Sequence, residues 1–149
     1  MVLSLRTSCL LLRAWRDEDI AAFAGMSADP DVMEYLLPLA ARGLSAEGWV
    51  ARKRLHWIEH GFGQWVVELI GEASFIGVIG LETVSYEAHF TPAVEVAWRL
   101  ARGYWVGATP PRPQERRLIT ALASCAWRRL WRLQFQAINA RAASWSASA

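Results

Sequence analysis

Three consecutive segments with the composition of β-strands occupy the middle of the chain and limit the folds that it can adopt. Residues 64–70 and 75–84 are rich in valine, isoleucine and other apolar side chains. Only a short stretch around Gly71 separates them, and a tight turn between two such runs is typical of a β-hairpin. The sequence therefore predicts a hairpin here, followed by a further strand at residues 94–100.

The strand at residues 94–100 alternates in polarity along its length. The apolar set consists of Val94, Val96 and Trp98. The set that alternates with it is mostly charged and consists of Glu95, Ala97 and Arg99. Because successive side chains of a strand point to opposite faces of the sheet, this alternation predicts a half-buried strand. We expect Trp98, like most of the other tryptophans before residue 105, to lie in the core or to line a groove.

The part of the chain before the hairpin carries helix signals. Acidic residues at 17–19 would complement the dipole of a starting helix, and a second short helix is expected near residues 29–31. Ser45 is a good N-cap, and the helix after it is expected to end at residues 60–61. A strand at residues 8–13 precedes these helices. The order of strand, helices and three strands indicates an α+β fold, with a further helix expected next.

The length and composition of the chain exclude several classes of protein. With 149 residues, of which 54% are hydrophobic, the chain is expected to form one globular domain. No apolar run could span a membrane and no secretory pattern is present, so we expect a cytoplasmic protein without a membrane partner. His56 and His60 have a spacing that can bind a metal ion, but no third ligand accompanies them and we expect no metal site.

The balance of charge changes abruptly at residue 105. Residues 1–105 carry nine Lys/Arg and thirteen Asp/Glu, a balance of −4. Residues 106–149 carry seven Arg and one acidic residue, a balance of +6. A break this sharp within one domain-sized chain requires a cause, and we divide the chain at this point into residues 1–105 and an atypical tail.

Four segments together identify a family. Residues 11–19, 60–65, 75–81 and 94–105 resemble, in order and spacing, segments of the GNAT-superfamily N-acetyltransferases. The resemblance extends over residues 8–105 and is to the branch that acetylates ribosomal-protein N-termini and related amines. It implies the GNAT acyl-CoA N-acyltransferase fold. It also implies transfer of an acetyl group from acetyl-coenzyme A to a primary amine, either a protein N-terminus or a small molecule.

The same resemblance implies functions for the strand at residues 94–100. Backbone groups of Trp98, Arg99 and Leu100 are expected to pair with the pantetheine arm of acetyl-coenzyme A. Glu95 is the candidate catalytic residue, because a carboxylate can act as the general base that takes a proton from the amine. The alternative for Glu95 is a solvated, outward-facing charge beside Arg99.

In this family the strand leads directly into a glycine-rich phosphate loop. In this chain the residues after Trp105 are Val106, Gly107 and Ala108, and prolines follow at positions 110, 111 and 113. The stretch from Trp105 to Ala108 is the candidate for the remaining cofactor contacts. Proline has no N–H to offer to a pyrophosphate, so acetyl-coenzyme A binding is expected to be weakened.

A shifted reading frame would account for the tail. Inserting one G after the Trp105 codon and regrouping the back-translated chain permits the missing loop in order, glycine-arginine-glycine-tyrosine-alanine-threonine-glutamate-alanine. The same shift permits the family's usual last-helix residues at the far end. We interpret residues 106–149 as a frameshifted tail, natural or from a sequencing error, that truncates the fold after the fourth strand. Genuine divergence of the tail is the alternative.

The tail retains a helical period. Leucines at 118, 122, 130 and 133 fall near one face and arginines flank it, so a basic helix is expected over about residues 114–134. We expect no nucleic-acid partner, because a shifted frame yields arginine without selection for one. The rival to an enzyme is a non-catalytic GNAT remnant or binding module, which would form a homodimer through the exposed edge of the fourth strand.

Overall fold

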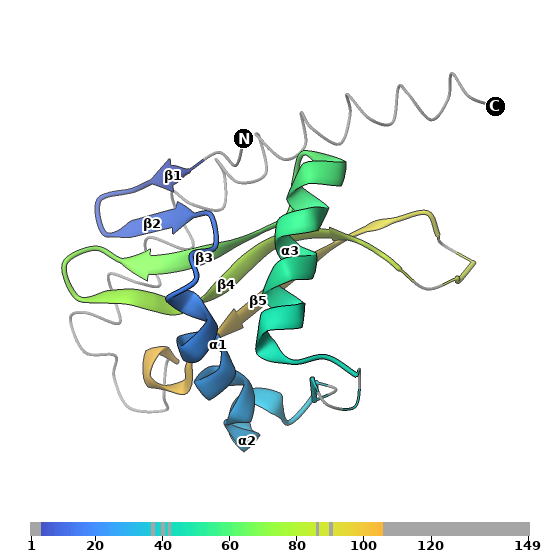
Figure 1. Ribbon diagram of the computed structural model, residues 1–149. Coiled ribbons are helices and arrows are strands. Elements are labelled where there is room, and N and C mark those ends of the chain that lie inside the picture. The colour runs from blue at the N-terminus through green and yellow to red at the C-terminus, as the bar shows by residue number, and fades with distance from the viewer. Residues whose placement is uncertain are drawn as a thin grey trace.

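One antiparallel sheet with helices packed on one face forms the framework of the chain (Figure 1). The computed structural model describes residues 4–36, 38–39, 41, 43–85, 87–89 and 91–105. Its strands are neighbours in space in the order in which they follow in sequence, and they are β1 (Leu5–Arg6), β2 (Leu10–Arg13), β3 (Gln64–Leu69), β4 (Ala73–Thr83) and β5 (Val94–Leu100). Helices α1 (Asp19–Ala28), α2 (Pro30–Met33) and α3 (Ala46–His60) connect β2 to β3.

The predicted order of strand, helices and three strands is confirmed. The chain forms one strand more than predicted, because residues 5–6 pair with residues 11–12 as a short hairpin, β1–β2. Two residues are too few for a periodicity signal, so sequence pattern alone could not reveal β1. A 3₁₀ turn over Arg102–Tyr104 follows β5. The predicted tail helix near residues 114–134 lies outside the described residues.

Helix α3 begins and ends as its sequence predicts. The Ser45 hydroxyl accepts a hydrogen bond from the backbone N–H of Gly48 at 3.1 Å, which satisfies one donor of the first turn. Gly61 ends the helix in the left-handed conformation, with a φ of 72°, and its N–H donates to the Trp57 carbonyl. These two caps fix the length of the helix that covers β4.

Two groups of buried side chains hold the layers together, one on each face of the sheet. Val66 and Val78 pack on the helical face against Phe23 and Trp49, whose rings stack with centroids 6.0 Å apart. The alternate residues of the same strands, among them Trp65, pack on the opposite face with the leucines of β1 and β2. The sheet is therefore buried on both faces at its centre.

A buried ion pair joins β2 to the first helix. The Arg13 guanidinium donates to both carboxylate oxygens of Asp19 at 2.7 and 2.8 Å, and its Nε donates to Glu68 at 2.8 Å. Side-chain exposure is 6% for Arg13 and 3% for Asp19. The hydrogen bonds that Arg13 donates to Asp19 are the largest effect that raises the pKa of Arg13. Asp19 thus anchors α1, beyond the contribution to the helix dipole that its sequence position predicted.

Substitution of Asp19 by asparagine should destabilise the fold strongly. The change removes the closer of the two carboxylates that compensate the buried Arg13 charge and leaves only Glu68, so the expected cost is about 3 kcal/mol in the free energy of unfolding. Urea unfolding followed by circular dichroism measures this cost. Asp17→Asn is the matched control, because Asp17 pairs with Arg54 at the surface and should cost less than about 1 kcal/mol. Equal costs for the two variants would contradict the assignment.

Candidate active site

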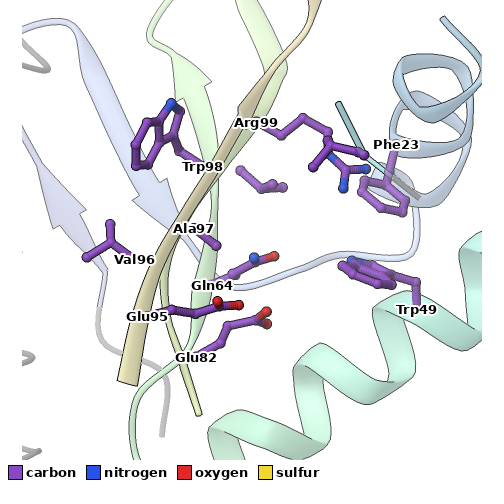
Figure 2. A pocket seen from close by; sticks show the side chains of 11 residues that line it. Phe23, Trp49, Gln64, Glu82, Glu95, Val96, Ala97, Trp98 and Arg99 are labelled. Atoms are coloured by element: carbon purple, nitrogen blue, oxygen red, sulfur yellow. The ribbon is translucent and has the colours of Figure 1, made fainter. Parts of the chain in front are cut away.

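A cavity lies between β4 and β5 on one side and helices α1 and α3 on the other (Figure 2). Its volume is about 330 Å³. It is lined by Phe23, Leu36, Trp49, Gln64, Val78, Glu82, Glu95, Val96, Ala97, Trp98 and Arg99. A second hollow of about 730 Å³ shares Trp49, Glu82 and Glu95 with the first and continues along α3. The shared residues place the two carboxylates where the hollows meet.

The half-buried character of β5 is confirmed, but its charged set faces the helices. Figure 2 shows Glu95 and Arg99 pointing into the cavity, whereas the Trp98 indole points away from it. Of the two positions expected for Trp98, the core is excluded because the side chain is 65% exposed, whereas the residue does contribute to the lining of the cavity. The cavity separates β5 from α3, and this open space lets ionised side chains occupy the helical face without full loss of hydration.

Two carboxylates face each other across the last two strands. Glu82 of β4 and Glu95 of β5 are direct partners in the antiparallel register, and both side chains extend into the cavity. Like charges in this position repel. Lys53 of α3 forms an ion pair with Glu82, and its Nζ lies 4.0 Å from the centroid of the Trp49 ring. These three charged groups together carry one net negative charge.

The opposite end of the cavity is positive. The Arg99 guanidinium lies 5.7 Å from the Phe23 ring centroid and 5.9 Å from that of Trp49, and it donates to the Ser27 hydroxyl at 3.2 Å. The two stacked rings form one wall between the carboxylates and the guanidinium. An acceptor in this cavity would therefore meet negative charge at one end, positive charge at the other and an aromatic surface between them.

Three residues of this site were not predicted from the sequence, and each has a structural reason. Glu82 could be found only through the register that sets it opposite Glu95. Lys53 lies on a helix whose orientation over the sheet no local pattern reports. Gln64 is a buried polar residue at the start of a strand whose next three residues are apolar, and a polar residue beside such a run is a signal that the sequence does carry.

His56 lies beside the carboxylates, at the back of the second hollow. Its Nδ1 lies 2.9 Å from the Phe62 carbonyl, which can only accept, so Nδ1 carries the proton. Its Nε2 accepts from the backbone N–H of Thr83 at 3.2 Å. Burial is the largest effect and lowers the pKa of His56. Within the described ranges, no three acidic, histidine or cysteine side chains gather closely enough to hold a metal ion.

Solved structures share this architecture. A protein described as a GNAT-family acetyltransferase from Bordetella pertussis superposes with a TM-score of 0.59, over 91% of this chain and 72% of its own, at 16% sequence identity. An acetyltransferase from Agrobacterium tumefaciens str. C58 superposes with a TM-score of 0.54, over 85% of this chain and 68% of its own, at 24% identity. At these identities the likeness defines an acetyltransferase-type α+β fold.

The family follows from the sequence model of the acetyltransferase (GNAT) domain, which matches residues 10–143. The chain therefore belongs to the GNAT acetyltransferase family. Members of this family use acetyl-coenzyme A and act on amine acceptors. In the part of the chain that the structure describes, no helix has both the length and the apolar composition to cross a membrane.

The outer edge of β5 carries backbone groups that point away from β4. The Ala101 N–H donates to the Ile76 carbonyl, and the strand register then directs the N–H and C=O of Trp98 and Leu100 away from β4. Within the described sheet β5 is the edge strand, so no neighbouring strand pairs with these groups. The backbone of Arg99 faces β4 instead, and only its side chain faces the cavity.

Beyond β5 the predicted cofactor residues divide into two groups. The Trp105 indole N–H donates to the Leu100 carbonyl at 2.8 Å, so this outward-facing carbonyl of β5 is already hydrogen-bonded. Val106, Gly107 and Ala108 lie outside the described residues. The pantetheine contacts of β5 and the pyrophosphate contacts of residues 106–108 both stay predictions.

His56 should make the stability of the protein depend on pH. The folded state resists protonation of its ring, whose charged neighbours are Lys53, His60 and Glu82. As pH falls below the ordinary histidine pKa of about 6.5, the unfolded chain takes up a proton before the folded chain does. The free energy of unfolding therefore decreases with falling pH until the folded-state pKa is also passed. His56→Gln should remove up to one proton, about 1.4 kcal/mol per pH unit, from the slope of unfolding free energy against pH.

Urea unfolding at pH values from 8 to about 5 measures this slope. His89→Gln is the control, because His89 is an exposed histidine of the loop between β4 and β5. Identical slopes for His56→Gln and the unaltered chain would show that the ring does not resist protonation in the folded state.

Proposed function

We propose that this chain is an N-acetyltransferase that transfers an acetyl group from acetyl-coenzyme A to a primary amine bound in the cavity beside β5. The observation that carries the proposal is the position of Glu95. Its carboxylate points into the cavity from the same strand whose outer edge fits the pantetheine arm. A base and a cosubstrate arm on one strand would bring the amine and the acetyl group together.

Glu95 is the proposed general base. A primary amine is protonated near neutral pH and must lose a proton before it can attack a carbonyl carbon. The Glu95 carboxylate would take this proton directly or through a water molecule. Lys53 supports the reaction by compensating Glu82, which otherwise would oppose a second ionised carboxylate directly across the strand pair. Acetyl-coenzyme A supplies the acetyl group as a thioester.

The acceptor is a small molecule or a protein N-terminus. The sequence motifs favour the branch that acetylates N-termini of ribosomal proteins, and the long second hollow along α3 would accommodate a chain that extends beyond the amine. A cytoplasmic location accords with either acceptor. The homodimer belongs to the alternative in which the edge of β5 pairs with a second copy instead of with the pantetheine arm.

For the tail we keep the frameshift as a proposal. The resemblance in the shifted frame supports it, and so does the break in charge at residue 105. The family match extends to residue 143 and thus crosses that boundary. If the sequence after Trp105 had lost all resemblance to the family, the match would be expected to end near that residue. The division into residues 1–105 and a tail, the truncated fold and the basic helix all depend on this point.

The alternative function is a non-catalytic remnant that binds an amine or a partner without acetyl transfer. The observation that favours it is the proline-rich stretch after residue 109, which lacks the N–H groups that would hold a pyrophosphate. In such a remnant the cavity would remain while turnover would be lost.

Glu95→Gln tests the general base. The amide keeps the shape of the side chain but cannot take a proton, so kcat/KM should fall about 10²- to 10⁴-fold. The assay follows release of free coenzyme A thiol at millimolar acetyl-coenzyme A, with panels of peptides and small amines. Glu72→Gln, on the exposed turn between β3 and β4, is the control and should keep full activity. Retention of activity by Glu95→Gln would assign the base elsewhere.

Acetyl-coenzyme A should bind this chain more weakly than micromolar. Isothermal titration measures the affinity, and a chain expressed from DNA with one G inserted after the Trp105 codon is the matched comparison. The inserted base should restore the phosphate loop and tighten binding at least about tenfold, since several backbone N–H groups would return. Micromolar binding by the present chain would contradict weakened binding, and coding DNA with no such repair would contradict the frameshift.

A further inference from the structure

A buried oxygen at the floor of the cavity has an unmet hydrogen-bonding capacity. Gln64, at the start of β3, is 4% exposed, and its Oε1 has no hydrogen-bond partner among the described residues. The backbone carbonyl of the same residue accepts from the Trp57 indole at 2.9 Å, so the main chain is satisfied and only the side-chain oxygen is not. A buried acceptor without a donor is unfavourable, and a bound donor would remove that cost.

Gln64 lines the cavity and has small neighbours in the sheet. In the sheet register Gln64 lies beside Gly80, and Gly80 lies beside Ala97, so the row contains two of the smallest residues. Figure 2 shows the Gln64 side chain next to the carboxylates of Glu82 and Glu95, on the same side of the sheet. Glu82 is the diagonal neighbour of Gln64, at a distance of about 7–8 Å, and Glu95 lies one strand further across the sheet, opposite Glu82.

The number and type of these acceptors match one chemical group. A primary ammonium carries three N–H donors and no acceptor. The cavity offers it three acceptor groups, the Gln64 amide oxygen and the carboxylates of Glu82 and Glu95. The charge also balances, because the two carboxylates and Lys53 leave one net negative charge. The Trp49 ring, which already lies against the Lys53 ammonium, gives the wall an affinity for cations.

We propose that Gln64, Glu82 and Glu95 form a binding site for a primary ammonium group, in which Gln64 selects amines that carry N–H donors. This inference rests on the proposed function for its biological meaning, since the acceptor would be held as its ammonium form before Glu95 takes the proton. Gln64 is a specificity-determining residue in this site. Fully methylated cations would satisfy the charge but would leave the buried Gln64 oxygen unpaired.

A binding experiment without acetyl-coenzyme A tests the site. The full chain is titrated with n-butylammonium and with n-butyltrimethylammonium, and ligand-observed NMR gives the two dissociation constants. The unaltered chain should prefer the primary ammonium about tenfold, as expected for a buried acceptor that is paired in one complex and unpaired in the other. In Gln64→Met, a near-isosteric change without an acceptor, the preference should fall below about threefold while n-butyltrimethylammonium binds as before.

Gln64→Glu is the control variant, because it keeps an acceptor oxygen at the same position and should retain the preference. The unaltered chain alone already challenges the proposal: equal affinity for the two cations would overturn it even if Gln64→Met failed to fold. Full preference in a folded Gln64→Met would also overturn it. A preference for the primary ammonium without any acetyl transfer would support the ammonium site and contradict the proposed acetyltransferase. Acetyl transfer that depends on Glu95, without that preference, would support the acetyltransferase and contradict the ammonium site.

Discussion

The candidate site depends on a salt bridge that does not touch it. Arg13 reaches from β2 to Asp19 at the first turn of α1 and to Glu68 on β3, so one buried guanidinium fixes the helix against two strands. Helix α1 carries Phe23, which stacks on Trp49 of α3 to form the aromatic wall of the cavity. Without the ion pair, the helical layer would lose its defined position over the sheet. The shape of the cavity follows from that position.

The distribution of charge around the cavity indicates a ligand-binding function rather than a simple gap in the packing. A pair of carboxylates opposite each other on neighbouring strands is unfavourable, and the chain retains it with one lysine placed over a tryptophan ring. A fold selected for stability alone would replace one of the two acids. The arrangement makes sense if the remaining negative charge is needed for a positively charged ligand, and if one carboxylate must stay free to accept a proton.

Much of the fold could be predicted because its signals are local. The caps of α3 lie in Ser45 and Gly61, and the hairpin is marked by Gly71, so each is decided by a few adjacent residues. Which face of β5 meets the helices could not be predicted, because the alternation of side chains along a strand is the same in either case. The Trp98 side chain therefore seemed suited to the core, and only the placement of α3 shows that the Glu95 side faces the helical layer.

The same limit applies to the candidate site. Glu95 was identified through a family resemblance to its strand, which is a signal along the sequence. Its partners Glu82 and Lys53 come from a different strand and from a helix, and their proximity is a property of the assembled layers. Residues beyond Trp105, which the resemblance also assigned to the cosubstrate, lie outside the described part of the chain, and their role remains a prediction.

The glycine in the middle of β4 suggests how the cavity could change in the course of evolution. A side-chain carbon at Gly80 would lie 2.1 Å from the Gly63 carbonyl oxygen and 2.6 Å from the Gln64 Cα, both of them backbone atoms that cannot yield. The sheet side of the cavity is therefore fixed at this point, and no substitution there can narrow it. Relatives that accept amines of other sizes would have to differ elsewhere, either on the helical side or at other sheet positions that line the cavity, such as Ala97.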